Sequence, residues 1–133
     1  MLIFSRTWAE KRCDDIARAR DEDVCGRIRD DGIDILIDVN GYTHSARTKM
    51  LGMRPAPIVV NWLGYPGTFG GSDIDYILAD ATIVAPGAED FYSETPVRLA
   101  HCYQSNDPLR HRSPRPVPKA EVGLPGDAFV LGA

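Results

Sequence analysis

Residues 55–68 have the sequence PAPIVVNWLGYPGT, in which a short apolar run ends abruptly in a turn rich in glycine and proline. An apolar run bounded by such breakers predicts a buried strand over residues 58–63. The sequence FGGSD follows directly at residues 69–73. Ligands of open α/β sheets bind beyond the carboxyl ends of the strands, so this loop is a candidate binding site. The alternative is that its glycines and prolines only form turns.

A second strand is predicted over residues 33–39, IDILIDV, where β-branched side chains occupy one face and Leu36 the other. The polar loop NGYTHS at residues 40–45 follows, and residues 46–53 suit about two turns of helix. A strand, a short helix and a strand form a βαβ crossover, which implies parallel pairing. Both polar loops should therefore leave the same edge of the sheet, which strengthens the prediction of a site there.

The remaining pattern also alternates between helix and strand. A low-amplitude apolar stripe predicts a helix over residues 5–20, and a clearer one predicts a helix over 22–30, capped by Asp21 or Glu22 and ended by Gly32. The later elements are a strand over 74–80, helical turns over 88–94 and a short strand over 97–99. This order predicts an α/β fold with a Rossmann-like parallel sheet.

Composition excludes several classes of function. The 133 residues are 44% hydrophobic, with a net charge of -4, so there is no basic footprint for nucleic acid. No apolar stretch is long enough for a membrane span and the start does not resemble a signal peptide, which predicts a cytoplasmic protein without membrane contact. Cys13, Cys25 and Cys102 have neither zinc-site nor disulfide-framework spacing and are expected to be buried or idle thiols.

Few side chains suggest reactive chemistry, because the sequence contains no metal-ligand spacing, no nucleophile elbow and no P-loop lysine. Arg47 could face an anionic ligand or only pair with a carboxylate. The backbone amides of the glycines at 64, 67, 70 and 71 would allow close approach of a phosphate or sugar. Other candidates, each with a solvated or structural alternative, are the histidines and the strand-end carboxylates: His44, His101, His111, Asp38, Asp75 and Asp80.

Five strings in this sequence carry a family resemblance through their order and spacing: DVNGYT at 38–43, RPAPI at 54–58, WLGYPGT at 62–68, DYI at 75–77 and YSE at 92–94. Together they resemble the catalytic region of the O-linked N-acetylglucosamine transferases and their SPINDLY-like relatives, glycosyltransferase family 41. The resemblance covers residues 20–107, and residues 123–131 resemble the entry to the second catalytic lobe of that family.

The resemblance implies a two-lobed, metal-independent, inverting glycosyltransferase that moves N-acetylglucosamine from UDP-N-acetylglucosamine to Ser or Thr hydroxyls of a protein acceptor, without a further cofactor. By position, Leu63, Gly64 and Pro66 match residues that line the donor sugar, and Thr43 and Arg47 match residues of the neighbouring loop. No residue here is assigned the proton transfer, because the general-base histidine of the family lies upstream of the matching region and its lysine lies in the second lobe.

The resemblance also divides the chain. Residues 1–104 are expected to form part of the first lobe, 105–122 a proline-rich linker, and 123–133 the start of a second lobe that is cut short. Such a fragment should be inactive alone and should self-associate through its exposed lobe face. The alternatives are a non-catalytic binding module derived from the lobe and, more remotely, a nucleotide-binding oxidoreductase, for which no GxGxxG motif is present.

Overall fold

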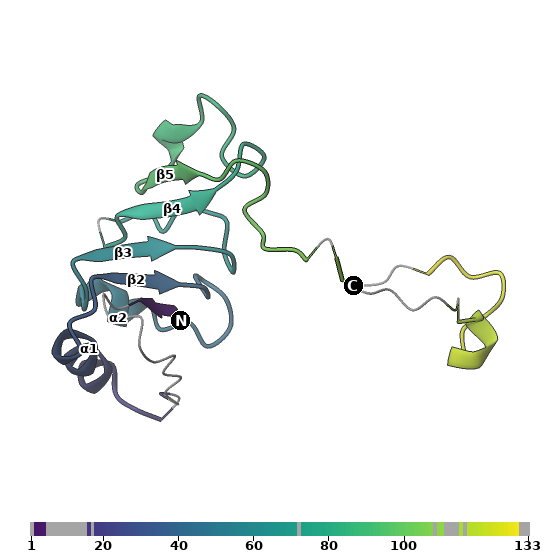
Figure 1. The fold of residues 1–133 in the computed structure, drawn as a ribbon, viewed down its shortest axis with the longest axis horizontal. Helices are drawn as coiled ribbons and strands as arrows, with labels where there is room; N and C mark the ends of the chain where they lie inside the picture. The colour runs from purple at the N-terminus through teal and green to yellow at the C-terminus, as the bar shows by residue number, and fades with distance from the viewer. Residues whose placement is uncertain are drawn as a thin grey trace.

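A computed structural model of the protein describes residues 2–4, 16, 18–71, 73–107, 109–110, 115 and 117–130. Its centre is a five-stranded sheet with the strands in chain order (Figure 1). The strands are β1 (Leu2–Phe4), β2 (Ile35–Asp38), β3 (Ile58–Asn61), β4 (Tyr76–Ala79) and β5 (Thr95–Arg98). Strands β2 to β5 are parallel, as predicted, and β1 pairs antiparallel with β2. The α/β fold with a Rossmann-like parallel sheet is thus confirmed.

Two helices, α1 (Asp21–Asp30) and α2 (Thr48–Gly52), pack against one face of this sheet. The hydrophobic core lies between them and the strands, and its members are Val24, Cys25, Ile28, Ile33, Leu36, Met50, Leu51, Ala56, Val59 and Ile74. Strand residues one position away from the core residues point to the opposite face, where Ile35, Tyr76 and Val97 keep 37%, 37% and 41% of their surface exposed. The apolar burial of the described residues is therefore concentrated on one side of the sheet.

Helix α1 ends as the sequence predicts but begins differently. Gly32 has φ 64°, its N–H donates to Arg29 O at 3.0 Å, and Ile33 N–H donates to Ile28 O at 3.2 Å, which together form a Schellman motif. The expected cap by Asp21 or Glu22 is wrong. Arg20 occupies the N-cap position without a side-chain cap hydrogen bond, and the helix dipole is instead matched by acidic residues in the first turn.

The helix α1 also supplies the buried thiol of Cys25, whose Sγ lies 3.6 Å from Met50 O in helix α2. Burial raises the pKa of this thiol, which keeps it protonated and unreactive at neutral pH. Cys102 is a free, exposed cysteine. The expectation of a buried or idle thiol therefore fits Cys25, and Cys13 lies outside the described residues.

Four further features differ from the sequence prediction or fall outside it. Strand β1 was not predicted, and β5 begins at Thr95 rather than 97 because Pro96 is tolerated in an edge strand. Residues 88–94 contain only a 3₁₀ turn, η1 (Glu89–Phe91). The predicted helix over 5–20 lies mainly outside the described residues, of which 16 and 18–20 are not helical.

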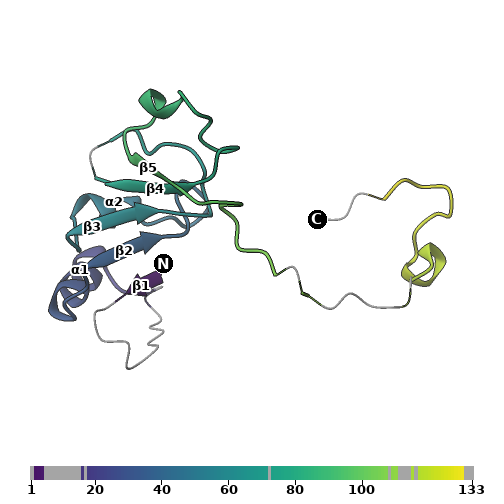
Figure 2. The same cartoon turned by 45° about the horizontal axis from the view of Figure 1, so that its top comes forward.

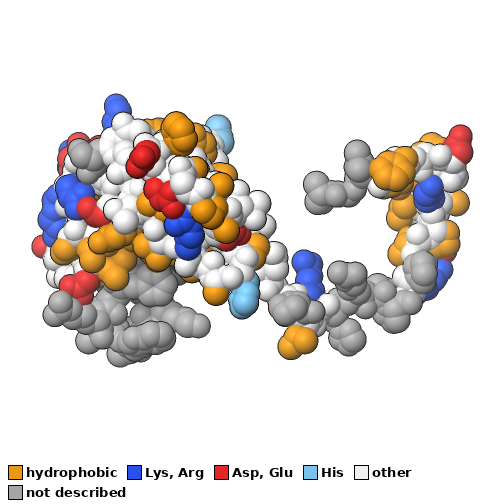
Figure 3. Space-filling view, turned by 90° about the horizontal axis from the view of Figure 1, so that it is seen from above, with side chains coloured by type: hydrophobic (Ala, Val, Ile, Leu, Met, Phe, Trp, Pro, Cys, Tyr) orange, Lys and Arg blue, Asp and Glu red, His pale blue; other side chains and the backbone are white. Residues whose placement is uncertain are grey.

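The carboxyl-terminal segment, residues 117–130, stands apart from the sheet and contains one 3₁₀ turn, η2 (Lys119–Val122) (Figures 1 and 2). Its hydrophobic side chains are exposed in the space-filling view (Figure 3), with Phe129 at 88% and Val122 at 57%. The domain boundaries at 104 and 122 remain a prediction.

Candidate functional site

Two loops leave the carboxyl edge of the sheet next to each other: the β2 loop, residues 39–47, and the β3 loop, residues 62–71. The register pairs Asp38, the last residue of β2, with Asn61, the last residue of β3. Parallel pairing therefore brings the two loops together at one edge, where α/β sheets bind ligands. The sequence predicted this convergence.

The turn at residues 38–43, where the β2 loop begins, is held by its own residues. The Asp38 carboxylate is largely buried and accepts hydrogen bonds from Gly41 N–H at 2.8 Å and Asn40 N–H at 3.3 Å. The Thr43 hydroxyl lies 2.8 Å from Asn40 O and 2.9 Å from Asn40 Oδ1, so it donates back into the same loop. These short-range bonds form an Asx-type turn that needs no distant partner.

The β3 loop begins with a strained turn at Leu63. Leu63 has φ 79°, a left-handed value that is costly for a side chain of this size, and Gly64 N–H donates to Trp62 O at 3.1 Å across it. A Cβ placed on Gly64 would lie 2.2 Å from Val39 O of the β2 loop. Backbone strain of this kind tends to gather at functional sites. Glycine is therefore required at 64 for contact between the loops.

A second close approach between the two loops involves Gly41 of the β2 loop and Tyr65 of the β3 loop. A Cβ on Gly41 would lie 2.1 Å from Tyr65 Cβ, and Gly41 has φ 60°. Next to this contact, the centroid of the Tyr42 ring lies 4.6 Å from that of the Phe69 ring and 5.4 Å from that of the Tyr65 ring. The two loops thus form one packed unit. In contrast, Gly70 and Gly71 have nothing within 4 Å of an added Cβ, so these two glycines take no part in the packing between the loops.

Two buried polar side chains fix the β3 loop, one next to it in sequence and one from the segment before β5. The Asn61 side chain is fully buried, and its Nδ2 donates to Tyr65 O at 3.0 Å and Gly67 O at 3.3 Å. Glu94, which is 2% exposed, accepts from Phe69 N–H at 2.6 Å. The loop conformation therefore depends on the end of β3 and on the segment before β5.

A third segment, residues 101–104, crosses the same edge after β5. Tyr103 N–H donates to Asp80 Oδ2 at 2.9 Å, and Trp62 Nε1–H donates to Tyr103 O at 2.8 Å. Asp80 also accepts from Thr82 and Ile83 N–H groups at 2.8 and 3.0 Å. Hydrogen bonds from these backbone amides, Tyr103 first, lower the pKa of the Asp80 carboxyl and keep it charged.

All five predicted donor-binding residues lie in the two loops, and Arg47 differs from the other four. Leu63, Gly64 and Pro66 are in the β3 loop and Thr43 is in the β2 loop, with Gly64, Pro66 and Thr43 exposed. The structure thus brings these four together at one edge. Contact with a donor sugar stays a prediction for each of them.

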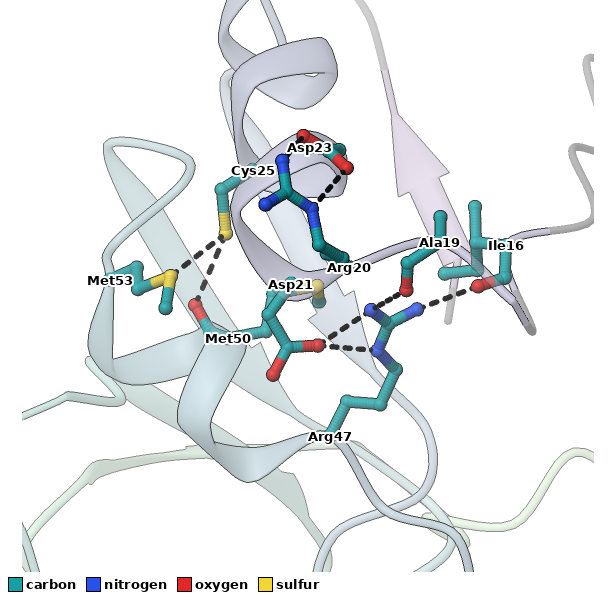
Figure 4. Close-up of polar contacts among 9 residues, drawn as sticks. All are labelled: Ile16, Ala19, Arg20, Asp21, Asp23, Cys25, Arg47, Met50 and Met53. Atoms are coloured by element: carbon teal, nitrogen blue, oxygen red, sulfur yellow. Dashed lines mark hydrogen bonds and ion pairs between the residues drawn. The ribbon is translucent and has the colours of Figure 1, made fainter.

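Arg47 also belongs to the β2 loop, but its side chain turns toward the start of α1 (Figure 4). Its Nε donates to Asp21 Oδ1 at 2.7 Å, Nη1 to Ile16 O at 2.8 Å and Nη2 to Ala19 O at 2.7 Å. The sequence left two roles open for Arg47, and the structure shows one of them, pairing with the carboxylate of Asp21. A donor-binding role for Arg47 stays a prediction.

The strand-end carboxylates bind the protein itself rather than a ligand. Asp38 and Asp80 accept backbone amides, and Asp75 accepts Val59 N–H at 2.8 Å and pairs with Arg54 at 3.0 Å. His44 and His101 are exposed, and His111 lies outside the described residues. Within the described ranges, no group of three or more His, Cys, Asp or Glu side chains is arranged to hold a metal ion.

A shallow pocket of about 220 Å³ opens beside the aromatic cluster, between the two loops and α2. It does not include Leu63, Gly64, Pro66 or Thr43. Its lining residues are Tyr42, Thr48, Lys49, Leu51, Gly52, Phe69, Gly71, Asp73 and Ile74.

Among the residues that the structure describes, no helix is long and apolar enough to cross a membrane.

This geometry can be compared with known proteins. The family model of glycosyl transferase family 41 matches residues 12–113, which include both loops and the Tyr103 segment. The chain belongs to glycosyl transferase family 41. It is 38% identical over 122 residues to the probable UDP-N-acetylglucosamine–peptide N-acetylglucosaminyltransferase SEC of Arabidopsis thaliana, covering 88% of this chain and 12% of that protein.

Other members of family 41 agree with this assignment. The UDP-N-acetylglucosamine–peptide N-acetylglucosaminyltransferase of Caenorhabditis elegans is 41% identical over 108 residues, covering 79% of this chain and 9% of that protein. The structure of a mutant O-GlcNAc transferase from Thermobaculum terrenum superposes with a TM-score of 0.62 at 34% identity, covering 71% of this chain and 19% of that one. The chain therefore spans about a tenth of the curated relatives it matches.

Sequence reasoning did not assign a role to Asn61, Thr68 or Glu94, although each contacts the β3 loop or belongs to it. Asn61 was counted within an apolar strand, and the YSE string at 92–94 contributed only to the family resemblance. The available signal was a polar residue at a predicted buried position, since such a residue normally requires a specific partner.

Proposed function

We propose that this family 41 chain contributes the first-lobe side of a sugar-nucleotide site in an enzyme that transfers N-acetylglucosamine from UDP-N-acetylglucosamine to Ser or Thr hydroxyls of proteins. The observation that carries the proposal is the packing of the β2 and β3 loops into one unit at the carboxyl edge, within the region matched by the family. Names of the relatives, which specify this donor and a peptide acceptor, support the choice of substrates.

In this proposal the β3 loop forms one wall of the donor cleft. Leu63, Gly64 and Pro66 would face the sugar, and Thr43 would approach it from the β2 loop. The backbone at Gly71 is additionally open to an anionic group, because nothing lies within 4 Å of the position of an added Cβ there. Transfer would need no metal ion, as the family resemblance implies.

We further propose that the 133-residue chain turns over negligibly by itself. Inverting transfer requires a base for the acceptor hydroxyl and stabilisation of the leaving nucleotide, each worth orders of magnitude in rate. The described carboxylates at this edge, Asp38, Asp80 and Glu94, are occupied by hydrogen bonds to the protein's own loops. They therefore support binding and orientation rather than proton transfer.

Calorimetric titration of the full chain with UDP-N-acetylglucosamine tests the proposal, with GDP-fucose as the competing donor. We expect weak but saturable binding of the UDP-sugar. Pro66→Ala should weaken it by about threefold to tenfold through lost contact area and a looser loop. Pro125→Ala is the matched control, since this exposed proline lies in the carboxyl-terminal segment outside both loops. Absence of binding by the unmodified chain would contradict the donor-site role, and sugar transfer by it would contradict the predicted inactivity.

A further inference from the structure

The segment immediately before β5 binds the β3 loop through a buried carboxylate. Glu94 is 2% exposed, and its two carboxylate oxygens have separate partners in the loop. Oε1 accepts from Phe69 N–H at 2.6 Å, and Oε2 accepts from the Thr68 hydroxyl at 2.8 Å. Glu94 therefore binds two loop residues that lie 26 and 25 positions earlier in the chain.

The Thr68 hydroxyl is the centre of this contact. Its oxygen accepts from Gly70 N–H at 3.0 Å and from Ser93 N–H at 3.2 Å, and Ser93 Oγ lies 3.0 Å away. Because these amides already occupy the lone pairs, the Thr68 proton is directed to Glu94. These hydrogen bonds join the β3 loop and the segment before β5 into one network, which includes the amide of Phe69 next to Gly70.

The network requires an acceptor-only side chain at position 94. Among the described ion pairs, none involves Glu94, so hydrogen bonds from the loop are what compensate its buried charge. A glutamine would fit sterically but would direct its NH₂ group at either the Phe69 amide or the Thr68 oxygen. The amide is itself a donor, and the oxygen already accepts from two N–H groups, so either orientation breaks the network.

We propose that Glu94 is a positioning residue of the donor site: through Thr68 and Phe69, its carboxylate fixes the β3 loop in the conformation that binds the sugar nucleotide, without touching the ligand. This inference rests on the proposed function. Glu94 is too deeply buried to meet a substrate directly, and its effect reaches the predicted sugar-lining residues only through the backbone of residues 66–70.

The test compares four variants of the full chain: Glu94→Gln, Thr68→Val, Thr68→Ser and Glu89→Gln. Thr68→Val keeps the shape but removes the hydroxyl, and Thr68→Ser restores it. Glu89→Gln makes the same charge change five positions away, at a residue that pairs with Arg98 and not with the loop. Three quantities are measured: the thermal midpoint, the hydrogen-exchange rate of the Phe69 amide by NMR without ligand, and the dissociation constant for UDP-N-acetylglucosamine.

We expect Glu94→Gln to speed exchange of the Phe69 amide and to weaken donor binding, each by about tenfold. Thr68→Val should show a smaller loss of about threefold in affinity, with Thr68→Ser close to the unmodified chain. Glu89→Gln should leave exchange and affinity unchanged. This ranking would support positioning by the network rather than general loss of stability.

The outcomes separate the inference from the function on which it rests. If the unmodified chain binds the donor and Glu94→Gln and Thr68→Val bind it equally well, the inference is wrong while the proposed function stands. Equal losses in Glu94→Gln and Glu89→Gln would also overturn it, since they would point to charge or stability alone. Failure of the unmodified chain to bind the donor would overturn the proposed function and, with it, the positioning role.

Discussion

The β2 loop and the β3 loop leave adjacent parallel strands at the same edge, yet they are held in different ways. The β2 loop is closed by neighbours in sequence: Asp38 binds Gly41 N–H, and Thr43 binds Asn40. The β3 loop is held by Glu94 and by Tyr103, which come from other parts of the chain. The turn at residues 38–43 of the β2 loop is therefore formed by residues close in sequence, whereas the β3 loop also needs partners from later parts of the chain.

This difference has a consequence for function. A loop closed by its own residues tolerates changes elsewhere in the protein, because its hydrogen bonds form and break locally. A loop fixed from several distant elements responds to changes in all of them. The glycine-rich β3 loop, which contains three of the predicted donor residues, is of the second kind. Its geometry can therefore be altered by substitutions that never touch a ligand.

The largest effect should come from filling the contact between the loops. Gly64→Ala places a Cβ 2.2 Å from Val39 O, so the backbones must separate, and we expect a loss of about 3 kcal/mol or more in the free energy of unfolding. Gly71→Ala is the matched control, because nothing lies within 4 Å of its Cβ. Urea denaturation monitored by circular dichroism measures both. Similar stability of the two variants would show that the loops do not pack together as described.

Next in size is removal of the Arg47 side chain, which tests whether this part of the β2 loop serves the fold or the ligand. Arg47→Ala loses the Asp21 pair and two carbonyl partners, so we expect about 2 kcal/mol of destabilisation. Denaturation provides the measurement, and Arg20→Ala, which breaks an exposed pair with Asp23, should be without measurable effect. An unchanged stability accompanied by weakened donor binding would instead identify Arg47 as a ligand-facing residue.

The smallest effect concerns the distant support of the β3 loop and depends on pH. Backbone hydrogen bonds lower the pKa of Asp80 in the folded state, so its carboxylate stabilises the fold above the unfolded pKa of about 4, and this contribution is lost as the pH falls through the lower folded pKa. Asp80→Asn should therefore lower the thermal midpoint at pH 7, and the difference from the unmodified chain should shrink in acid. Thermal melts between pH 7 and 2 measure it. A difference that does not change with pH would contradict a charged Asp80.

The periodic parts of the chain were predictable from sequence. The four parallel strands, helix α1 and its end at Gly32 follow from β-branched runs, an apolar stripe and a left-handed glycine. The sequence did not predict β1, because three residues next to a charged stretch carry no period of their own. The sequence also predicted that β5 begins at residue 97, whereas it begins at Thr95. The reason is that proline normally argues against a strand unless the strand lies at an edge.

The sequence by itself also determined that two polar loops would meet at one edge, because parallel strands must end on the same side. It could not determine which glycines are needed for packing and which are open. Gly64 and Gly41 are fixed by contacts across the loops, and Gly70 and Gly71 are not, although all four look alike in sequence. Nor could it show that Arg47 turns to Asp21 or that Glu94 holds Thr68. These assignments depend on distances between residues far apart in the chain, which only the tertiary structure sets.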